Sequence, residues 1–295
     1  MYKKNRGHKI FSVFNVFFLG IASLLCILPF WHLLAVSFSE SSAVSAGKVG
    51  FWPVDFTVQS YAFAFTGGKF LPALLISIER VILGVGVNLV LMVLTAYPLS
   101  RSKEKLMGRN IYMGYFVLTM IVSGGLIPTY LTVTRLNLLN SIWALILPTA
   151  MQTYNMIILM NFIRGLPEEL EEAAMIDGAG PLTVLLRIVL PLMKPALATV
   201  GLFCIINHWN DWFSGMIYMQ DPAKYPLQTY LQTLLKNFEE LMKAAGSDYI
   251  QLISMMNVRT GRAAQLFLGA LPVMLIYPFL QRYFTDGLVL GSVKG

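Results

Sequence analysis

The residues of this chain best suited to chemistry lie in one stretch that combines carboxylates with small and apolar side chains, and the chemistry they favour is docking. The stretch has two blocks separated by nine residues, Glu172-Ala173-Ala174-Met175-Ile176-Asp177-Gly178 and Ile188-Val189-Leu190-Pro191. Its carboxylates can meet basic groups on a partner, and its alanines let a partner surface approach closely. The glycine that closes the first block favours the left-handed conformation in which many helices end. The residue types and their spacing predict a bent contact element.

Residues 164–194 predict two short helices joined by a glycine corner. Pro167 suits a first helical position, and the acids after it suit a helix N-terminus. Pro181 begins the second helix and Pro191 ends it. The apolar residues of the loop are Met175, Ile176, Leu182, Val184, Leu185 and Ile188. Two short helices cannot bury all of these alone, so the loop indicates an interaction site. The alternative is a solvated loop with an acidic helix start.

Motifs of common catalytic sites are missing from the sequence. It contains no G-x-x-x-x-G-K-[ST] phosphate-binding loop, no H-E-x-x-H pair and no G-x-S-x-G nucleophile. Cys26 and Cys204 both fall in apolar segments, where packing explains them better than a disulfide or a metal site. We therefore expect no catalytic residue, no metal and no cofactor in this chain. Any ATP hydrolysis linked to it must come from another polypeptide.

The composition indicates a protein that crosses a membrane several times. Of its 295 residues, 56% are hydrophobic and 13% are charged, whereas soluble domains carry about 25% charge. A spanning helix needs roughly 20 mainly apolar residues. The candidate spans are 11–38, 70–98, 111–132, 141–162, 195–219 and 263–285. Lipid leaves backbone groups to be satisfied within each segment, and the runs are too long for barrel strands. We predict an all-α membrane protein with six spans in a single domain, residues 1–295.

The basic residues predict the orientation of the spans. Lys and Arg gather in the N-terminal segment, in the loops 99–110 and 164–194, and in the C-terminal tail. Since such residues favour the cytoplasmic side, we place these regions and both termini in the cytoplasm. The first apolar run exceeds the usual apolar region of a signal peptide, so we expect it to be retained. The net charge of +7 follows from this asymmetry and does not indicate a nucleic-acid partner.

Polar side chains inside the predicted spans indicate a solute path or its outer gate. Asn207, Asn210, Asp211 and Ser214 recur at helical spacing within an arc of about 100° of the fifth span. Other deep polar residues that could line the path are Asn88, Gln152 and Asn155. The alternative for all of them is hydrogen bonding between helices.

Other residues in the spans favour structural roles. We expect Glu79 and Arg80 to form an interfacial pair near the outer end of the second span, rather than a binding site. Pro148 and Pro272 should kink the fourth and sixth spans. Such kinks could serve gating or be ordinary features of membrane helices. His208 stands alone and is expected to be structural, with no part in a proton relay.

The docking stretch resembles the EAA loop, E-A-A-x3-G-x9-I-x-L-P, of permease subunits of ATP-binding-cassette (ABC) importers. Segments that resemble the carbohydrate-uptake group of this family are 138–141, 144–148 and 208–213. Residues 225–228 and 291–295 are similar to the branch named for lipo-oligosaccharide, aldouronate and pectin- or alginate-derived oligosaccharide importers. The resemblance covers most of the chain. It implies the type I importer permease fold, with six transmembrane helices and a cytoplasmic EAA coupling loop at 164–194.

The resemblance also implies partners and a location. The chain would be one of two permease subunits, in a heterodimer with a second permease in the bacterial plasma membrane. Two separate ATPase subunits would bind ATP and magnesium, and an extracellular solute-binding protein would deliver a sugar. Residues implied for the ATPase contact are Glu172, Ala173, Ala174, Asp177, Gly178, Ile188 and Pro191. Substrate contacts in such importers can lie mainly in the partner permease, so the polar residues of the spans could gate without binding.

Other transporters stay open on the sequence alone. An ABC permease for an amino acid or a metal would share the same loop. A secondary transporter driven by an ion gradient would need buried ionisable groups in mid-membrane, and the chain offers at most Asp211. A membrane enzyme is disfavoured by the missing motifs, and a purely structural subunit is a further alternative. The residues do not name the sugar, the second permease or the ATPase.

Overall fold

The computed structural model describes residues 6–65, 69–102, 104–244 and 258–292, which contain helices and turns and no strand. The α-helices are α1 (Arg6–Ser37), α2 (Ser41–Ser45), α3 (Gln59–Phe65), α4 (Phe70–Ser100), α5 (Arg109–Ile121), α6 (Leu126–Arg135), α7 (Ile142–Ile146), α8 (Thr153–Arg164), α9 (Glu169–Ile176), α10 (Pro181–Val184), α11 (Leu190–Leu192), α12 (Lys194–Asn210), α13 (Phe213–Tyr218), α14 (Leu227–Ala244) and α16 (Val258–Ser292). Short 3₁₀ turns cover Leu147–Thr149 and Pro222–Lys224, and a π-turn covers Leu185–Val189.

The chain divides into two compact units, of which the first comprises residues 1–68 and 231–271. Its helix α1 has an apolar stretch, Phe11–Ser37, that is long enough to cross a membrane. The apolar side chains of this stretch are largely exposed, as suits contact with lipid. At the end of α1 the hydroxyl of Ser37 lies 2.7 Å from that of Tyr61, and the ring of Phe38 packs on the rings of Phe56 and Tyr61.

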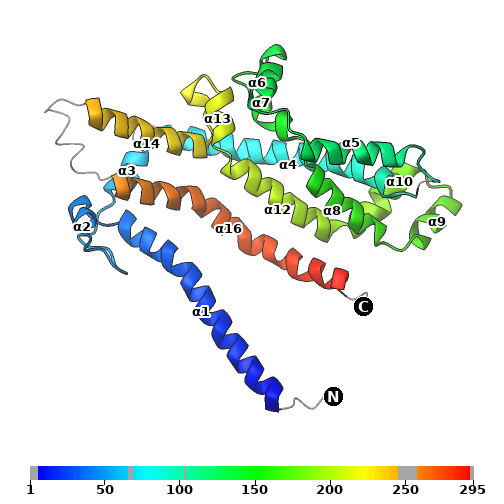
Figure 1. Cartoon of the computed structure of the whole chain (residues 1–295), viewed down its shortest axis with the longest axis horizontal. Coiled ribbons are helices and arrows are strands. Elements are labelled where there is room, and N and C mark those ends of the chain that lie inside the picture. The colour runs from blue at the N-terminus through cyan, green and yellow to red at the C-terminus, as the bar shows by residue number, and fades with distance from the viewer. Residues whose placement is uncertain (1–5, 66–68, 103, 245–257, 293–295) are drawn as a thin grey trace. The chain divides into compact units, whose positions relative to one another are not determined.

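The second unit comprises residues 69–230 and 272–295, and its core lies where α4, α8 and α12 pack together. The core is apolar: Met92 and Ala96 of α4 meet Leu159 of α8, and Val200 of α12 joins them. Buried Cys204 belongs to the same cluster, in agreement with its predicted packing role. Figure 1 shows α9 and α10 at one end of this bundle and α13 at the other. The two ends are the places where candidate functional residues gather.

Broken helices distinguish the second unit from a simple bundle of straight spans. Helix α4 is continuous and long enough to span, in agreement with the prediction for 70–98. Three pairs of helices could each form one bent span: α5 with α6 (bent by 111°), Ile142–Thr149 with α8 (56°), and Pro181–Leu192 with α12 (80°). The described residues thus hold up to five candidate spans by length and composition. The predicted sixth segment, 263–285, lies inside α16.

The predicted third and fifth segments differ from the continuous helices that the sequence analysis expects. The structure divides 111–132 after Ile121, where Gly125 adopts φ 82° and the chain turns. It divides 195–219 at Asp211, which has extended backbone angles. The predicted kink at Pro148 lies in the 3₁₀ turn between α7 and α8. The apolarity of a segment carries no information on where its backbone breaks.

Candidate functional site

At one end of the second unit, α9 ends at a left-handed glycine corner. Asp177 caps the helix, and Gly178 follows with φ 83°. The backbone N–H of Gly178 donates to the carbonyl of Met175 over 3.0 Å, and that of Ala179 donates to Ala174 over 2.9 Å. Gly180 then leads into α10, whose first residue is Pro181. A residue with a β-carbon is strained at such a φ angle, so glycine sets the direction in which the chain leaves α9.

Large apolar side chains are exposed on α9, on α10 and on the π-turn that follows. Ile176 is 86% exposed, and Met175, Leu182 and Leu186 of the π-turn are exposed too. The other face is anchored, because Ala174 and Ala179 are half-buried against the core. Exposed aliphatic side chains at this density on two short helices indicate a contact surface. We call this the α9–α10 face, defined by Ala173, Met175, Ile176, Asp177 and Leu182.

Charged side chains lie between α9 and the C-terminal end of α4. Glu171 of α9 is buried and forms an ion pair with Arg101, which caps α4. Lys105 lies at 3.8 Å from Glu168 and at 4.0 Å from Glu172, and all three of these side chains are exposed. Arg101, Lys105, Glu168 and Glu171 border a cavity of about 470 Å³.

At the other end of the unit, α4 presents a polar face to the broken helices. Ser77, Arg80, Gly84 and Asn88 recur at spacings of three and four residues, so they share one side of α4. Arg80 is 1% exposed and Asn88 is fully buried. The Oγ of Ser77 accepts a 2.7 Å hydrogen bond from the backbone N–H of Leu227. The side chains of Ser77, Arg80 and Asn88 each meet a place where a neighbouring helix begins or ends.

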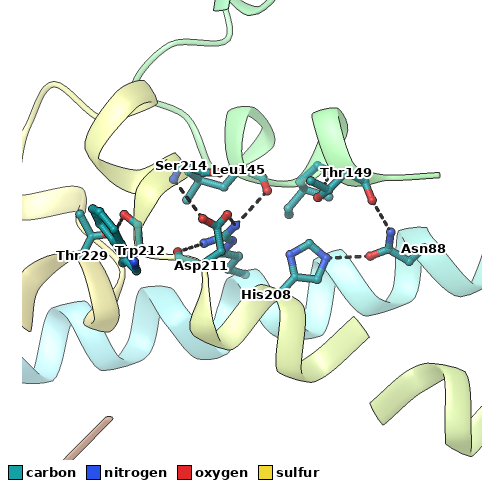
Figure 2. Close-up of polar contacts among 10 residues, drawn as sticks. Asn88, Leu145, Thr149, His208, Asp211, Trp212, Ser214 and Thr229 are labelled. Carbon is teal, nitrogen blue, oxygen red and sulfur yellow. Dashed lines mark hydrogen bonds and ion pairs between the residues drawn. The ribbon is translucent and has the colours of Figure 1, made fainter. Parts of the chain in front are cut away.

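Arg80 joins the break after α12 to the end of α7. Its Nη1 donates to the backbone carbonyl of Asp211 over 2.8 Å, and its Nη2 lies 2.5 Å from the Oδ2 of Asp211. The same Nη2 reaches the carbonyl of Leu145 over 3.3 Å. The Oδ1 of Asp211 in turn accepts a hydrogen bond from the backbone N–H of Ser214, in the first turn of α13 (Figure 2). Carbonyls released by a helix break need such partners where water is scarce.

Asn88 performs the same task at the break between α7 and α8. Its side-chain amide donates to the carbonyls of Thr149 and Ala150, both over 2.8 Å. Its Oδ1 lies 2.7 Å from the Nε2 of His208, which lies on α12 (Figure 2). The side chain of His208 is held against Gly84, where a β-carbon would come within 2.5 Å of the ring. The histidine is therefore a structural contact between α4 and α12.

A second polar cluster lies where α8 begins beside α12. The Oε1 of Gln152 accepts from the amide of Asn155 over 2.5 Å and from that of Asn207 over 3.5 Å. Asn155 is buried, whereas Asn207 is exposed. Asn210, one turn further along α12, is exposed as well. This side of α12 presents amides outward from the unit.

Comparisons with known proteins decide the family. No protein-family model matches the chain. The protein LplC of Bacillus subtilis is 39% identical over 293 residues, which cover 98% of this chain and 97% of LplC. The polygalacturonan/rhamnogalacturonan transport system permease protein YtcP of Bacillus subtilis is 39% identical over 291 residues, 98% of this chain and 99% of YtcP. The chain belongs to the permease proteins of ABC transporters.

The permease also resembles a solved structure of a bacterial ABC transporter involved in the import of the acidic polysaccharide alginate. That match has a TM-score of 0.80 and 29% identity, and it covers 96% of this chain and all of that one.

The structure places the sequence-predicted residues of the permease at the two ends of one unit. Glu172, Ala173, Asp177 and Gly178 are exposed, and Ala174 is half-buried. In the second block, Ile188 is half-buried in the π-turn and Pro191 is exposed. Their role in an ATPase contact stays a prediction.

The predicted polar stripe is divided by the helix break. Asn207 and Asn210 lie on α12, Asp211 lies in the break, and Ser214 lies on α13. Asn207 joins Gln152 and Asn155 in one cluster, whereas Asp211 and Ser214 join Arg80. The residues are thus divided between two networks instead of forming one helical face. Whether they line a path stays a prediction.

The expected interfacial pair of Glu79 and Arg80 is wrong. Adjacent residues of a helix point in different directions, and Glu79 is exposed while Arg80 is buried against Asp211. Sequence reasoning missed Arg80 and His208 as network members. The signal was present in the periodicity of α4, where Ser77, Arg80 and Asn88 share one face.

The contact between Gly84 and His208 yields a matched pair of variants. We expect Gly84→Ala to destabilise the permease by about 1–3 kcal/mol, since the added methyl group displaces the ring of His208. Gly86→Ala lies on the same helix with open space around its β-carbon, and it should be neutral or stabilise by up to about 1 kcal/mol. Thermal unfolding of both variants in one detergent measures the difference. Equal melting temperatures would contradict the contact.

Proposed function

We propose that this permease is the gate of an ATP-driven importer for oligosaccharides, worked by a separate ATPase that docks on the α9–α10 face. The observation that carries the proposal is the exposure of this face, with Ile176 86% exposed beside Asp177 and Gly178. The face lies in the segment with the EAA spacing, in a protein of the ABC permease family. ATP and magnesium would be bound by the ATPase, and this chain would supply no cofactor site of its own.

The proposed substrate class rests on the named relatives. The printed name of YtcP concerns polygalacturonan and rhamnogalacturonan, and another relative is the arabinooligosaccharides transport system permease protein AraQ of Bacillus subtilis, at 28% identity over 97% of this chain. The solved structure belongs to a transporter involved in alginate import. These substrates are all carbohydrate chains, and two of the three names concern acidic ones. We propose oligosaccharides from plant or algal polysaccharides, delivered by an extracellular solute-binding protein.

A second permease subunit is proposed from the exposed amides of α12. Asn207 and Asn210 are exposed on the surface of their own unit, and amide side chains that face lipid are unfavourable. Facing another permease across a hydrated path would satisfy them. We propose that Asn207, Asn210, Gln152 and Asn155 line this path. Asn88, Asp211 and Ser214 hold the broken helices around it.

The proposed topology follows the charge pattern. Six spans would place both termini and the loop 164–194 in the cytoplasm of a bacterium, within the plasma membrane. The α9–α10 face would then meet the ATPase directly. Labelling of Ile176→Cys with a membrane-impermeant thiol reagent tests this, in a Cys26→Ser and Cys204→Ser background. Labelling in opened vesicles but not in intact cells is the expected result.

The function itself is tested by copurification and uptake. We expect the tagged permease to bring down an ATPase and a second permease from its own organism. Cells that carry it should take up at least one member of a panel of oligogalacturonides, rhamnogalacturonan oligosaccharides, alginate oligosaccharides and arabino-oligosaccharides, and deletion of its gene should abolish that uptake. Uptake that continues after the ATPase is inactivated would contradict the proposal, as would uptake of amino acids or metals alone.

A further inference from the structure

We propose that Arg101 is a positioning residue that sets the rotation of α9 through its buried ion pair with Glu171. The inference rests on the proposed docking of an ATPase at the α9–α10 face, and it assigns the part of the permease that aims this face. Glu171 is the one buried side chain of α9. A short helix whose buried residue is a carboxylate is held mainly by what that carboxylate binds.

The surroundings of Arg101 fix its guanidinium from two sides. Its Nη2 forms the ion pair with Glu171, and its Cζ lies 4.2 Å from the ring centre of Tyr97, one turn back along α4. Arg101 caps α4 with extended backbone angles, so its side chain returns toward the end of that helix. A guanidinium held by an aromatic ring and a carboxylate has little freedom to move. The carboxylate is thereby tied to the rigid end of α4.

The position of Glu171 on α9 determines which side chains of this helix face away from the unit. At about 100° per residue, Ala173 and Ile176 lie roughly 200° and 140° around the helix from Glu171. Both are exposed, and Ile176 is the most exposed of the large apolar side chains of the helix. A helix pinned at Glu171 therefore presents Ala173 and Ile176 away from the unit. If the pin is lost, the eight residues of α9 depend on the small contact of Ala174 with the core.

The neighbouring charged residues cannot replace the ion pair between Arg101 and Glu171. Lys105 lies at 3.8 Å from Glu168 and at 4.0 Å from Glu172, and all three groups are exposed. Exposed pairs at such distances contribute little. A buried carboxylate that loses its partner is costly in comparison. Lys105 thus provides a matched control: it carries the same charge, borders the same cavity and belongs to the same loop as Arg101.

The α4 helix connects the ion pair of Arg101 and Glu171 to the broken helices. The C-terminal end of α4 contacts α9 through Arg101, and its N-terminal part contacts the break after α12 through Arg80. One continuous helix of 31 residues therefore contacts both the proposed docking element and the broken helices. With the ion pair between Arg101 and Glu171 in place, a force that the ATPase exerts on α9 is transmitted to α4. Without the ion pair, the same force rotates α9 instead.

The test uses the complete importer, purified through the permease and reconstituted in proteoliposomes with its solute-binding protein. The transported probe is the member of the oligosaccharide panel that wild-type cells take up. Oligosaccharide imported and ATP hydrolysed are measured together for wild type, Arg101→Ala, Glu171→Gln, the double variant and Lys105→Ala. We expect Arg101→Ala to lower the import per ATP about tenfold with ATPase still bound. Lys105→Ala should stay within about twofold of wild type, as expected for an exposed pair.

The double variant separates a pair from two independent residues. If Arg101 acts through Glu171, adding Glu171→Gln to Arg101→Ala causes no further loss, because the same interaction is already absent. Multiplying losses would overturn the proposal. It would also be overturned if Arg101→Ala only reduced the amount of assembled complex and left import per ATP unchanged, since that is a purely structural effect. A wild-type permease that binds no ATPase would instead contradict the proposed function, and this inference with it.

Discussion

Gly178→Val should abolish coupled import while the permease still enters the membrane. Gly178 has φ 83°, where a β-branched side chain is an outlier. The strain of about 1–3 kcal/mol falls on a single corner. It can be relieved by turning the chain between α9 and α10, which displaces the α9–α10 face from its partner. We expect uptake to fall about ten- to a hundredfold, measured in cells against the amount of permease in the membrane.

A neighbouring glycine provides the control for this corner. Gly180 has φ −73° and extended backbone angles, and a β-carbon there meets nothing within 4 Å. Gly180→Val should therefore leave uptake near that of wild type. No atom lies within 4 Å of a β-carbon at Gly178 either, so the two variants differ in backbone conformation and not in crowding. Gly178→Asn should be intermediate, since asparagine tolerates the left-handed region. Normal uptake by Gly178→Val would contradict the coupling role.

The sequence predicted the positions of apolar segments better than their continuity. Residues 11–38 and 70–98 correspond closely to α1 and α4, because a long apolar run with no adjacent pair of glycines favours an unbroken helix. The run 111–132 contains Ser123-Gly124-Gly125, and the structure turns there. The run 195–219 has no glycine or proline within three residues of Asp211, yet the helix stops at Asn210. That break depends on Arg80, which is remote in sequence and supplies partners for the released groups.

The candidate site divides in the same way. The end of α9 at Gly178 follows from local residue preferences, so the sequence predicted it without tertiary information. The networks of Arg80, Asn88 and His208 depend on which helices become neighbours. Their hydrogen bonds between helices join residues more than 50 positions apart in the chain, and periodicity alone could only place these residues on one face of each helix. The pairing of Glu171 with Arg101 is of the same kind.

The network of Arg80 and Asp211 gives the second large expected effect, a loss of stability. Arg80 is 1% exposed and neutralises Asp211, while it also binds the carbonyls of Asp211 and Leu145. Removal of one member of a buried ion pair leaves the other charge without compensation, which costs about 3–5 kcal/mol. The broken ends of α7 and α12 lose their shared donor at the same time. These costs fall on the permease whether or not any partner is bound.

Arg80→Ala should accordingly lower the melting temperature of the purified permease in detergent by about 10 °C. Glu79→Ala is the matched control, because Glu79 is the preceding residue of α4 and is exposed. This variant should have the same melting temperature as the wild type. In the double variant Arg80→Ala with Asp211→Ala, the uncompensated carboxylate is gone, so we expect part of the lost stability to return. Equal melting of Arg80→Ala and Glu79→Ala would show that the ion pair does not hold the break. A double variant less stable than Arg80→Ala would show that Asp211 acts mainly through Ser214, as the starting point of α13, and not as the counter-charge of Arg80.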